Sequence, residues 1–253
     1  MTAAPTASAM SDSLARFARH RLARVGAYGV GVALAVLAVV AGTVGFALVV
    51  GATLDRADLL RLDAETHRWL FEAFGASATL GRVVTWFGNH DTLVAGVVGV
   101  ALALLIARRP WAAFRVVFAS GVGGPVSVGL KALFERARPL EQVIPATGYS
   151  FPSGHAFAST VFYGVLLYVV WRLTERRAVR VAAAVVLPAI ILAVGASRVY
   201  LNVHYPTDVI AGWLAGAAWL GASLLIVETV ETRTRSWRER REERTRAPDA
   251  TPD

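Results

Sequence analysis

The stretch YSFPSGH at residues 149–155 stands directly before the apolar run AFASTVFYGVLLYVVW at residues 156–171. Pro152 can occupy the first position of a helix, where its missing N–H is not needed. The backbone N–H groups that follow lie at a positive helix end, which is a natural seat for an anion. Gly154 has no Cβ to keep an anion away, and His155 adds an acid/base group. The turn is therefore either a polar cap before a membrane span or one wall of an anion site.

Apolar runs of this kind recur along the chain and decide the fold class. The chain has 253 residues, of which 55% are hydrophobic, and its mean hydropathy is +0.51. This is too apolar for an ordinary soluble domain, and several runs approach the ~20 residues that cross a bilayer. We predict an all-α integral membrane protein with six transmembrane helices in one bundle. The expected spans are 25–51, 92–107, 111–134, 155–171, 181–196 and 206–227, with the third interrupted at the GVGGP of residues 121–125.

The segments outside the spans predict a simple domain organisation. Residues 1–24 are expected to be a disordered, basic N-terminus, 25–228 the six-span domain and 229–253 a charged tail. The first apolar run is too long for a signal peptide and lacks a clear cleavage site. Residues 52–91 carry leucine and tryptophan at roughly helical spacing, which predicts an interfacial helical segment between the first two spans. His90 and Asp91 are expected to cap the next helix, with substrate contact as the alternative.

The distribution of charge predicts the orientation of the bundle. The net charge is +8, and 18 of the 26 basic residues lie in the N-terminus, the two arginine-rich loops and the tail. The positive-inside rule therefore places both termini in the cytoplasm of a multi-pass protein of the cell membrane. Segments 52–91, 131–154 and 197–205 then share the outer face. Arginines gathered at span ends argue against a nucleic-acid partner, and the lack of cysteine excludes disulfides and thiolate chemistry.

Three polar pieces are predicted to meet at that outer face. They are KALFERARP at 131–139, PSGH at 152–155 and SRVYLNVHYPTD at 197–208. Lys131 and Arg138 are two helical turns apart and are expected to share a helix face. Two arginines, a lysine and a helix N-terminus could surround one tetrahedral dianion, with a histidine on either side. The charged and acid/base members of the pieces are Lys131, Arg138, His155, Arg198, His204 and Asp208.

These pieces resemble the type 2 phosphatidic acid phosphatase superfamily, whose pattern is K-x6-R-P, P-S-G-H and S-R-x5-H-x3-D in that order. All eleven defined positions are present in residues 131–208. The six-span layout is similar to the membrane-bound bacterial lipid phosphatase branch of that superfamily.

The resemblance implies a role for each matched residue. His204 would be the nucleophile that forms a phosphohistidine, with Asp208 orienting its ring, and His155 would be the general acid. The phosphate oxygens would be held by Lys131, Arg138, Ser153, the Gly154 N–H and Arg198. Glu135 and Arg136 lie outside the pattern and are expected to be merely solvated.

The function implied is hydrolysis of a lipid phosphomonoester or diphosphate at the outer leaflet. Polyprenyl diphosphate, phosphatidic acid and phosphatidylglycerol phosphate are the candidate substrates. The alternatives are a phosphotransferase with a non-water acceptor and a non-catalytic lipid-binding or transport protein that retains the pocket. A metal-dependent phosphatase would need clustered acids, but the motif pieces contain only Glu135 and Asp208. We therefore expect no metal and no cofactor.

Overall fold

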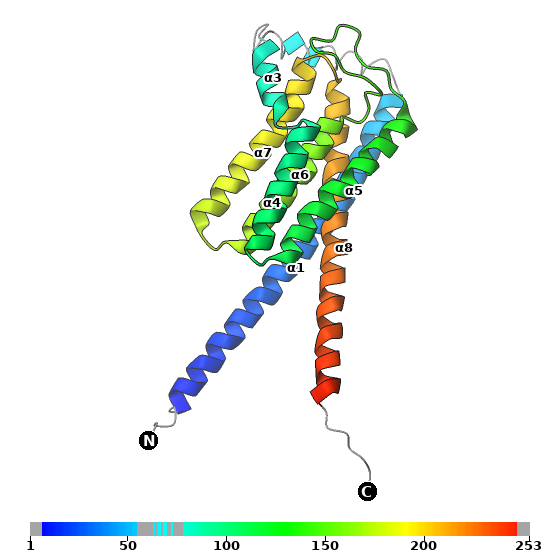
Figure 1. Cartoon of the computed structure of the whole chain (residues 1–253). Coiled ribbons are helices and arrows are strands. Elements are labelled where there is room, and N and C mark those ends of the chain that lie inside the picture. Colours follow the sequence, from blue (N-terminus) through cyan, green and yellow to red (C-terminus); the bar gives the residue numbers. More distant parts are fainter. Residues whose placement is uncertain are drawn as a thin grey trace.

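The structure of the chain is a computed structural model that describes residues 7–54, 63, 65–66, 68–69, 72 and 78–246. In these residues all regular structure is helical (Figure 1). The helices are α1 (Ala7–Leu54), α3 (Ala78–Trp86), α4 (His90–Ile106), α5 (Pro110–Phe134), α6 (Gly154–Leu173), α7 (Arg177–Tyr200) and α8 (Pro206–Arg246).

Six helical stretches of the described chain are long and apolar enough to cross a membrane, as predicted. The second of them, Ala78–Ile106, combines α3 with α4 across a short turn and so begins earlier than the predicted 92. The others are Gly29–Ala52, Pro110–Phe134, Gly154–Leu173, Arg177–Tyr200 and Pro206–Glu243. The expected interfacial segment falls mainly on residues 55–77, most of which lie outside the described residues.

The two terminal helices continue beyond the predicted membrane spans. α1 begins at Ala7, so it includes most of the segment expected to be disordered, and α8 continues to Arg246. Alanine, leucine and arginine, which are frequent in residues 7–24, are among the best helix formers. A run of apolar residues shows which part of a helix lies in the membrane. Where the flanking residues also have high helix propensity, the helix continues outside the membrane.

The predicted interruption of the third span is wrong. α5 runs without a break from Pro110 to Phe134, with Pro125 inside it. Proline removes only its own helical hydrogen bond, whereas unwinding the backbone at membrane depth would leave several polar groups without partners. A continuous helix that lacks one hydrogen bond therefore has a lower free energy than a helix interrupted in the membrane.

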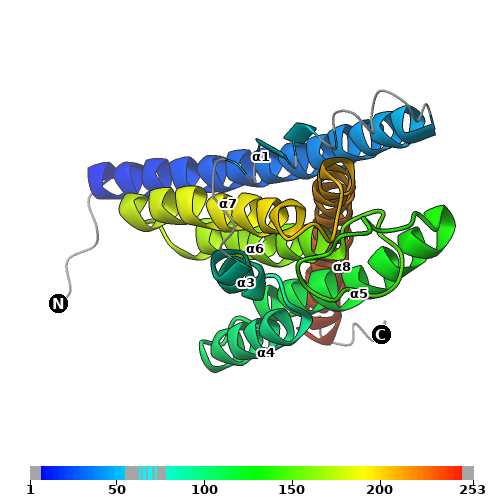
Figure 2. The same cartoon turned by 90° about the horizontal axis from the view of Figure 1, so that it is seen from above.

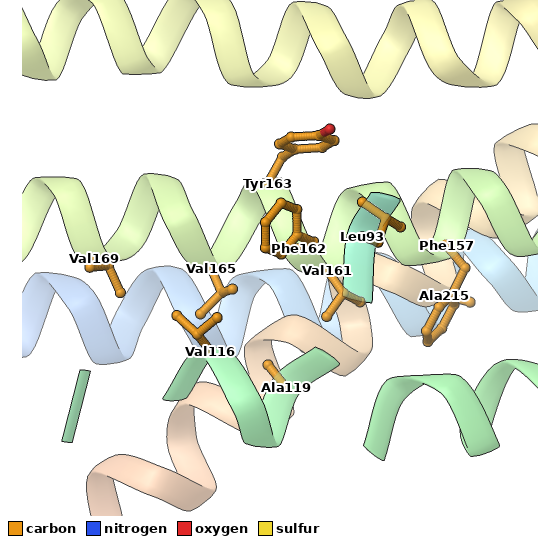
Figure 3. Packing of buried hydrophobic residues seen from close by; sticks show 10 residues of the cluster. All are labelled: Leu93, Val116, Ala119, Phe157, Val161, Phe162, Tyr163, Val165, Val169 and Ala215. Atoms are coloured by element: carbon orange, nitrogen blue, oxygen red, sulfur yellow. The ribbon is translucent and has the colours of Figure 1, made fainter. Parts of the chain in front are cut away.

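α6 is the central helix of the bundle. Half of the residues in the most apolar part of α6 are buried, whereas in the other candidate spans this share is 33% or less. It packs against α4, α5, α7 and α8. Six of the ten residues of the largest buried hydrophobic cluster belong to α6, among them Phe157, Val161 and Phe162 (Figure 3). The residue that begins α6 is thus held by the best-packed part of the molecule.

Close contacts of α8 with α6 and α1 complete the frame of the site. A Cβ added to Gly212 would lie 2.6 Å from the Ser153 carbonyl oxygen, and one added to Gly221 would lie 2.5 Å from the Ala35 carbonyl oxygen. Small residues allow such close backbone approach between membrane helices. Figure 2 shows α8 seated beside both α1 and α6.

The bundle has two distinct ends. α3 and the connections at 135–153 and 201–205 lie at one end, while α1 begins and α8 ends at the other (Figure 1). The predicted meeting of the three polar pieces at one end is confirmed.

Candidate active site

The N-terminus of α6 forms one wall of the site, although not as predicted. Ser153 is the N-cap and Gly154 the first helical residue, so Pro152 lies outside the helix rather than at its first position. The backbone N–H of Ser153 donates to the backbone oxygen of Asp208, at 2.8 Å. The first helical bond runs from Phe157 N to Ser153 O. The Gly154 N–H therefore precedes the helical ladder and is oriented out of the helix end.

His204 is buried at 2% exposure, and its two ring nitrogens have different partners. Nδ1 lies 3.4 Å from Oδ2 of Asp208, and Nε2 lies 3.2 Å from a terminal nitrogen of Arg138. A guanidinium can only donate hydrogen bonds, so Nε2 must be the nitrogen without a proton. The proton is on Nδ1, on the side of the carboxylate. This tautomer presents the Nε2 lone pair toward Arg138.

Asp208 is fully buried and its carboxylate is held from several sides. Oδ2 accepts hydrogen bonds from the Ser150 hydroxyl and, at 2.9 Å, from the Tyr205 backbone N–H. Oδ1 accepts one from Arg136 at 2.6 Å. A buried carboxylate needs such partners to remain ionised. The network therefore holds a negative charge beside the Nδ1–H of His204.

Arg136 is not merely solvated, and that expectation is wrong. Besides Asp208, its guanidinium donates to Asp63 at 3.0 Å and to the Thr207 hydroxyl at 2.8 Å. The guanidinium also lies 4.1 Å from the centre of the Tyr205 ring. Asp63 is itself buried and accepts a hydrogen bond from the Thr207 backbone N–H. Arg136 therefore joins the segment before α3 to the beginning of α8. Glu135 is exposed as expected, and it accepts a hydrogen bond from Tyr149.

Lys131 and Arg138 come together, but not on one helix face. α5 ends at Phe134, and Glu135 has a left-handed backbone, so Arg138 lies in the following connection. Both cations hold the same backbone segment. Lys131 Nζ donates to the Tyr149 oxygen at 2.7 Å, and Arg138 donates to the oxygens of Gly148 and Thr147.

Two buried polar atoms beside these cations have no hydrogen-bond partner among the described residues. They are Oγ of Ser153 and Nε of Arg198. Arg198 lies in the last turn of α7 at 4% exposure and donates from another nitrogen to the Thr85 hydroxyl of α3. Buried donors are nearly always satisfied, and phosphate oxygens would satisfy both of these.

His155, the second residue of α6, is oriented by Asn89. Its Nε2 lies 3.0 Å from the Asn89 side-chain oxygen, which can only accept, so this nitrogen carries a hydrogen. Asn89, not His90 or Asp91, is the N-cap of α4, and Asp91 lies in the first helical turn. His90 and Asp91 are exposed, and the residue that reaches the site is their neighbour.

Burial lowers the pKa of His204 to about 4, and the nearby Asp208 opposes this shift. Arg138 and Lys131 lower the pKa further because they repel a positive imidazolium. His204 is therefore neutral at neutral pH, and its Nε2 keeps the lone pair that attack on phosphorus would require.

Four residues in this arrangement were not predicted from the sequence: Asp63, Thr85, Asn89 and Ser150. Each contacts a motif residue from another part of the chain. Ser150 adjoins the PSGH piece, and its position was the one available signal. The other three lie in residues 52–91, where the helical spacing of leucine and tryptophan does not single out any polar residue.

Comparison with known proteins agrees with the site. The pattern that defines the PAP2 superfamily matches residues 112–231. Phosphatidylglycerophosphatase B of Bacillus subtilis is 29% identical over 135 residues, which are 53% of this chain and 66% of that protein. An undecaprenyl-diphosphatase of Sulfolobus acidocaldarius is 28% identical over 159 residues, 60% of this chain and 72% of that protein.

Solved structures share the fold. A transmembrane PAP2-type phosphatidylglycerolphosphate phosphatase from Bacillus subtilis superposes with a TM-score of 0.68 at 22% identity, covering 78% of this chain and 97% of that one. LpxE of Aquifex aeolicus gives a TM-score of 0.52 at 21% identity, covering 67% and 96%. The relatives named here are phosphatases and a diphosphatase, which are phosphoester or diphosphate hydrolases. Over residues 112–231 the chain is similar to the PAP2 superfamily, and its relatives there include PAP2-type membrane lipid phosphatases.

Proposed function

We propose that this chain hydrolyses a lipid phosphomonoester or diphosphate through a phosphohistidine on His204. The observation that carries the proposal is the tautomer of His204, whose unprotonated Nε2 lies 3.2 Å from Arg138 while Nδ1 is beside Asp208. A nucleophile needs a lone pair aimed at the place where the phosphate is held. The Asp208 carboxylate then stabilises the positive charge that develops on the ring as the N–P bond forms.

The reaction has two steps with balanced proton transfers. In the first, Nε2 of His204 attacks phosphorus and the bond to the lipid oxygen breaks. His155, which takes up a proton when the bound anionic phosphate offsets the surrounding cations, gives that proton to the departing oxygen. In the second, water attacks the phosphohistidine while neutral His155 takes a proton from it, and phosphate leaves. Asn89 keeps the His155 ring oriented through both steps.

The phosphate oxygens would be held by the cationic cradle. Lys131 and Arg138 supply charge from the end of α5 and the following connection, and Arg198 supplies it from α7. Ser153 Oγ and the Gly154 N–H supply neutral donors at the N-terminus of α6. In phosphoryl transfer, positioning and charge stabilisation of this kind provide most of the catalysis.

The site lies at one end of a membrane bundle, which suits a substrate whose tail stays in the bilayer (Figure 1). The relatives are a phosphatidylglycerophosphatase and an undecaprenyl-diphosphatase, which support a glycerolipid phosphate or a polyprenyl diphosphate. We place the site at the outer leaflet, from the arginine distribution. No metal is required in this scheme. Among the described residues, no three histidines or acids are grouped as metal ligands would be.

The test is steady-state phosphate release by the full chain in detergent with EDTA, using one lipid tail that carries either a monophosphate or a diphosphate. Release supports hydrolysis over transfer to another acceptor, and no release from any lipid phosphate would favour a non-catalytic binding protein. His204→Ala should abolish release from both substrates.

His155→Ala should separate the two substrates. The alkoxide that leaves a monoester is strongly basic and needs the proton, whereas a departing phosphate has a second pKa of about 6. General acid catalysis is worth roughly 10²–10⁴-fold where it is needed, so the monoester should suffer far more. Equal losses for both substrates would contradict the assignment of His155.

A further inference from the structure

At the end of the bundle opposite the candidate active site, residues of α5, α6, α8 and the α4–α5 connection line a cavity of about 300 Å³. The connection between α4 and α5 contributes to its lining, and so does the end of α6. Both lie at this end of the bundle (Figure 1). Five arginines from three parts of the chain line it: Arg108, Arg109, Arg115, Arg172 and Arg235.

The cavity keeps a surplus of positive charge after its internal ion pairs are counted. Buried Arg115 bonds to both Glu228 and Glu231, Arg172 lies 3.6 Å from Glu228, and Arg235 pairs with Glu231. These three arginines therefore share two carboxylates as ion-pair partners. Arg108 and Arg109 have no ion pair within the described part of the chain. Five arginines against two glutamates leave a net charge of +3.

The cavity lies at the depth of lipid headgroups. α6 has 20 residues, and a rise of about 1.5 Å per residue makes it about 30 Å long. This is roughly the thickness of the hydrocarbon core. One end of α6 carries the candidate site, and the other, at Leu173, lines the cavity. The two sites therefore face the headgroup layers of opposite leaflets.

The remaining wall of the cavity is apolar. Trp111, Val169 and Leu173 line it, and Leu173 is 41% exposed on the outer surface of the bundle. A soluble anion gains nothing from such a wall, whereas the glycerol and upper chains of a lipid would pack on it. Basic pockets between membrane helices are suited to anionic lipid headgroups. Orientation in the membrane does not require a cavity, because exposed arginines such as Arg176 and Arg177 serve that purpose equally well.

We propose that this cavity binds the phosphate headgroup of an anionic phospholipid, as a second lipid site separate from the candidate active site. Arg108 and Arg109 are free to contact the phosphate, while Arg115 and Arg172 keep the pocket positive. The proposal does not depend on the chemistry assigned to His204.

The test measures lipid retention by native mass spectrometry on the full chain in neutral detergent. The probes are phosphatidylglycerol, phosphatidylcholine and, as a soluble competitor, glycerol 3-phosphate. The cavity variant is Arg108→Gln/Arg109→Gln, and its matched control is Arg176→Gln/Arg177→Gln, which removes the same charge from the neighbouring connection at the same end. All four arginines are exposed, so neither variant disturbs the core.

Wild type and the control should retain phosphatidylglycerol in preference to phosphatidylcholine. The cavity variant should lose that preference by about 30-fold, since each basic residue near an anionic lipid contributes about 1 kcal/mol and a factor of ten corresponds to about 1.4 kcal/mol. Equal losses in both variants would show that only diffuse charge matters and would overturn the proposal. Displacement by glycerol 3-phosphate at equal concentration would identify a soluble phosphate as the ligand and would overturn it as well.

Discussion

Arg136 lies between two buried carboxylates that come from distant parts of the chain. One of its terminal nitrogens donates to Asp208 and the other to Asp63, so the guanidinium fork spans both acids. Asp208 in turn faces the Nδ1–H of the nucleophile candidate, His204. Arg136 therefore acts on the reaction through Asp208 and is a positioning residue. A lysine in its place keeps the charge but cannot bridge the two carboxylates with one planar group.

Replacing Arg136 with lysine should lower kcat by about 10–100-fold, because a misplacement of about 1 Å in the site can cost about 100-fold. KM should change little, since Arg136 does not touch the substrate. Asp63→Asn should act through the same fork, so the double variant should lose little more than Arg136→Lys alone. Kinetics of the four proteins provide the measurement. Additive losses would mean that Asp63 does not act through Arg136.

The low pKa of His204 predicts a specific pH dependence of stability. The folded protein holds this ring neutral down to a pKa of about 4, whereas an unfolded chain protonates it below its ordinary value of 6.5. Between these values the unfolded state binds more protons, so folding stability falls as the pH falls. From pH 7 to pH 5 the loss from this group is about 2 kcal/mol. It should be absent in His204→Gln.

Thermal unfolding in detergent at the two pH values measures this difference. Between pH 7 and pH 5, the melting temperature of the wild type should fall by several degrees more than that of His204→Gln. An identical pH response of the two proteins would show that His204 is not held neutral by burial.

Among individual residues, the sequence predicted those of the motif but not their hydrogen-bond partners. The spacing of Lys131, Arg138, His155, His204 and Asp208 was enough to place them in one site. Their hydrogen-bond partners are set by three-dimensional packing between segments. Asn89 is 66 residues from His155 in the chain, and no local pattern marks it. The same holds for Asp63, a single acid among several in a polar segment.

Among the contacts between helices, the one between α6 and α8 holds the N-terminus of α6 in position at the candidate site. Gly212 of α8 packs against the backbone of Ser153, the residue that begins the α6 wall of the cradle. A methyl group there would lie 2.6 Å from the Ser153 carbonyl oxygen, which is backbone and cannot rotate away. The two helices would have to separate, and the cradle would widen.

Gly212→Ala should therefore reduce turnover by at least tenfold and lower the melting temperature. Gly121→Ala in α5 is the matched control, since a Cβ there meets nothing within 4 Å and alanine favours a helix. Measuring phosphate release and thermal unfolding of both variants gives the comparison. Wild-type turnover in Gly212→Ala would show that the close contact does not position the cradle.

Hydropathy located the helices well, because about 20 apolar residues in sequence can do little else in a bilayer. Helix ends and interruptions were harder to predict. Pro125 does not break α5, and α5 ends at Phe134, before Arg138. The continuity of α5 and the position of its end both depend on which hydrogen-bond partners the backbone finds in the folded protein. The sequence pattern does not contain that information.

The whole molecule is polarised, with the candidate site at one end and the beginning of α1 and end of α8 at the other (Figure 1). The arginine distribution predicts that the site end faces outward. Because the chain has no cysteine, single-cysteine variants report orientation cleanly. Leu140, in the connection at the site end, is fully exposed, and Arg240 is exposed near the end of α8.

Leu140→Cys should react with a membrane-impermeant thiol reagent on intact cells, and Arg240→Cys only after lysis. Gel-shift labelling of the two variants provides the measurement. The opposite pattern would place the site at the cytoplasmic leaflet and exclude a substrate presented from outside.

In the proposed mechanism, Nε2 of His204 becomes bonded to phosphorus during turnover. The most direct measurement is mass spectrometry of the full chain, mixed briefly with a lipid diphosphate in the presence of EDTA and quenched in alkali, where phosphohistidine survives. We expect phosphate on the peptide that contains His204, more of it in His155→Ala because water attack is slowed, and none in His204→Gln. Turnover with phosphate on another residue, or with no phosphorylated protein in His155→Ala, would contradict this mechanism.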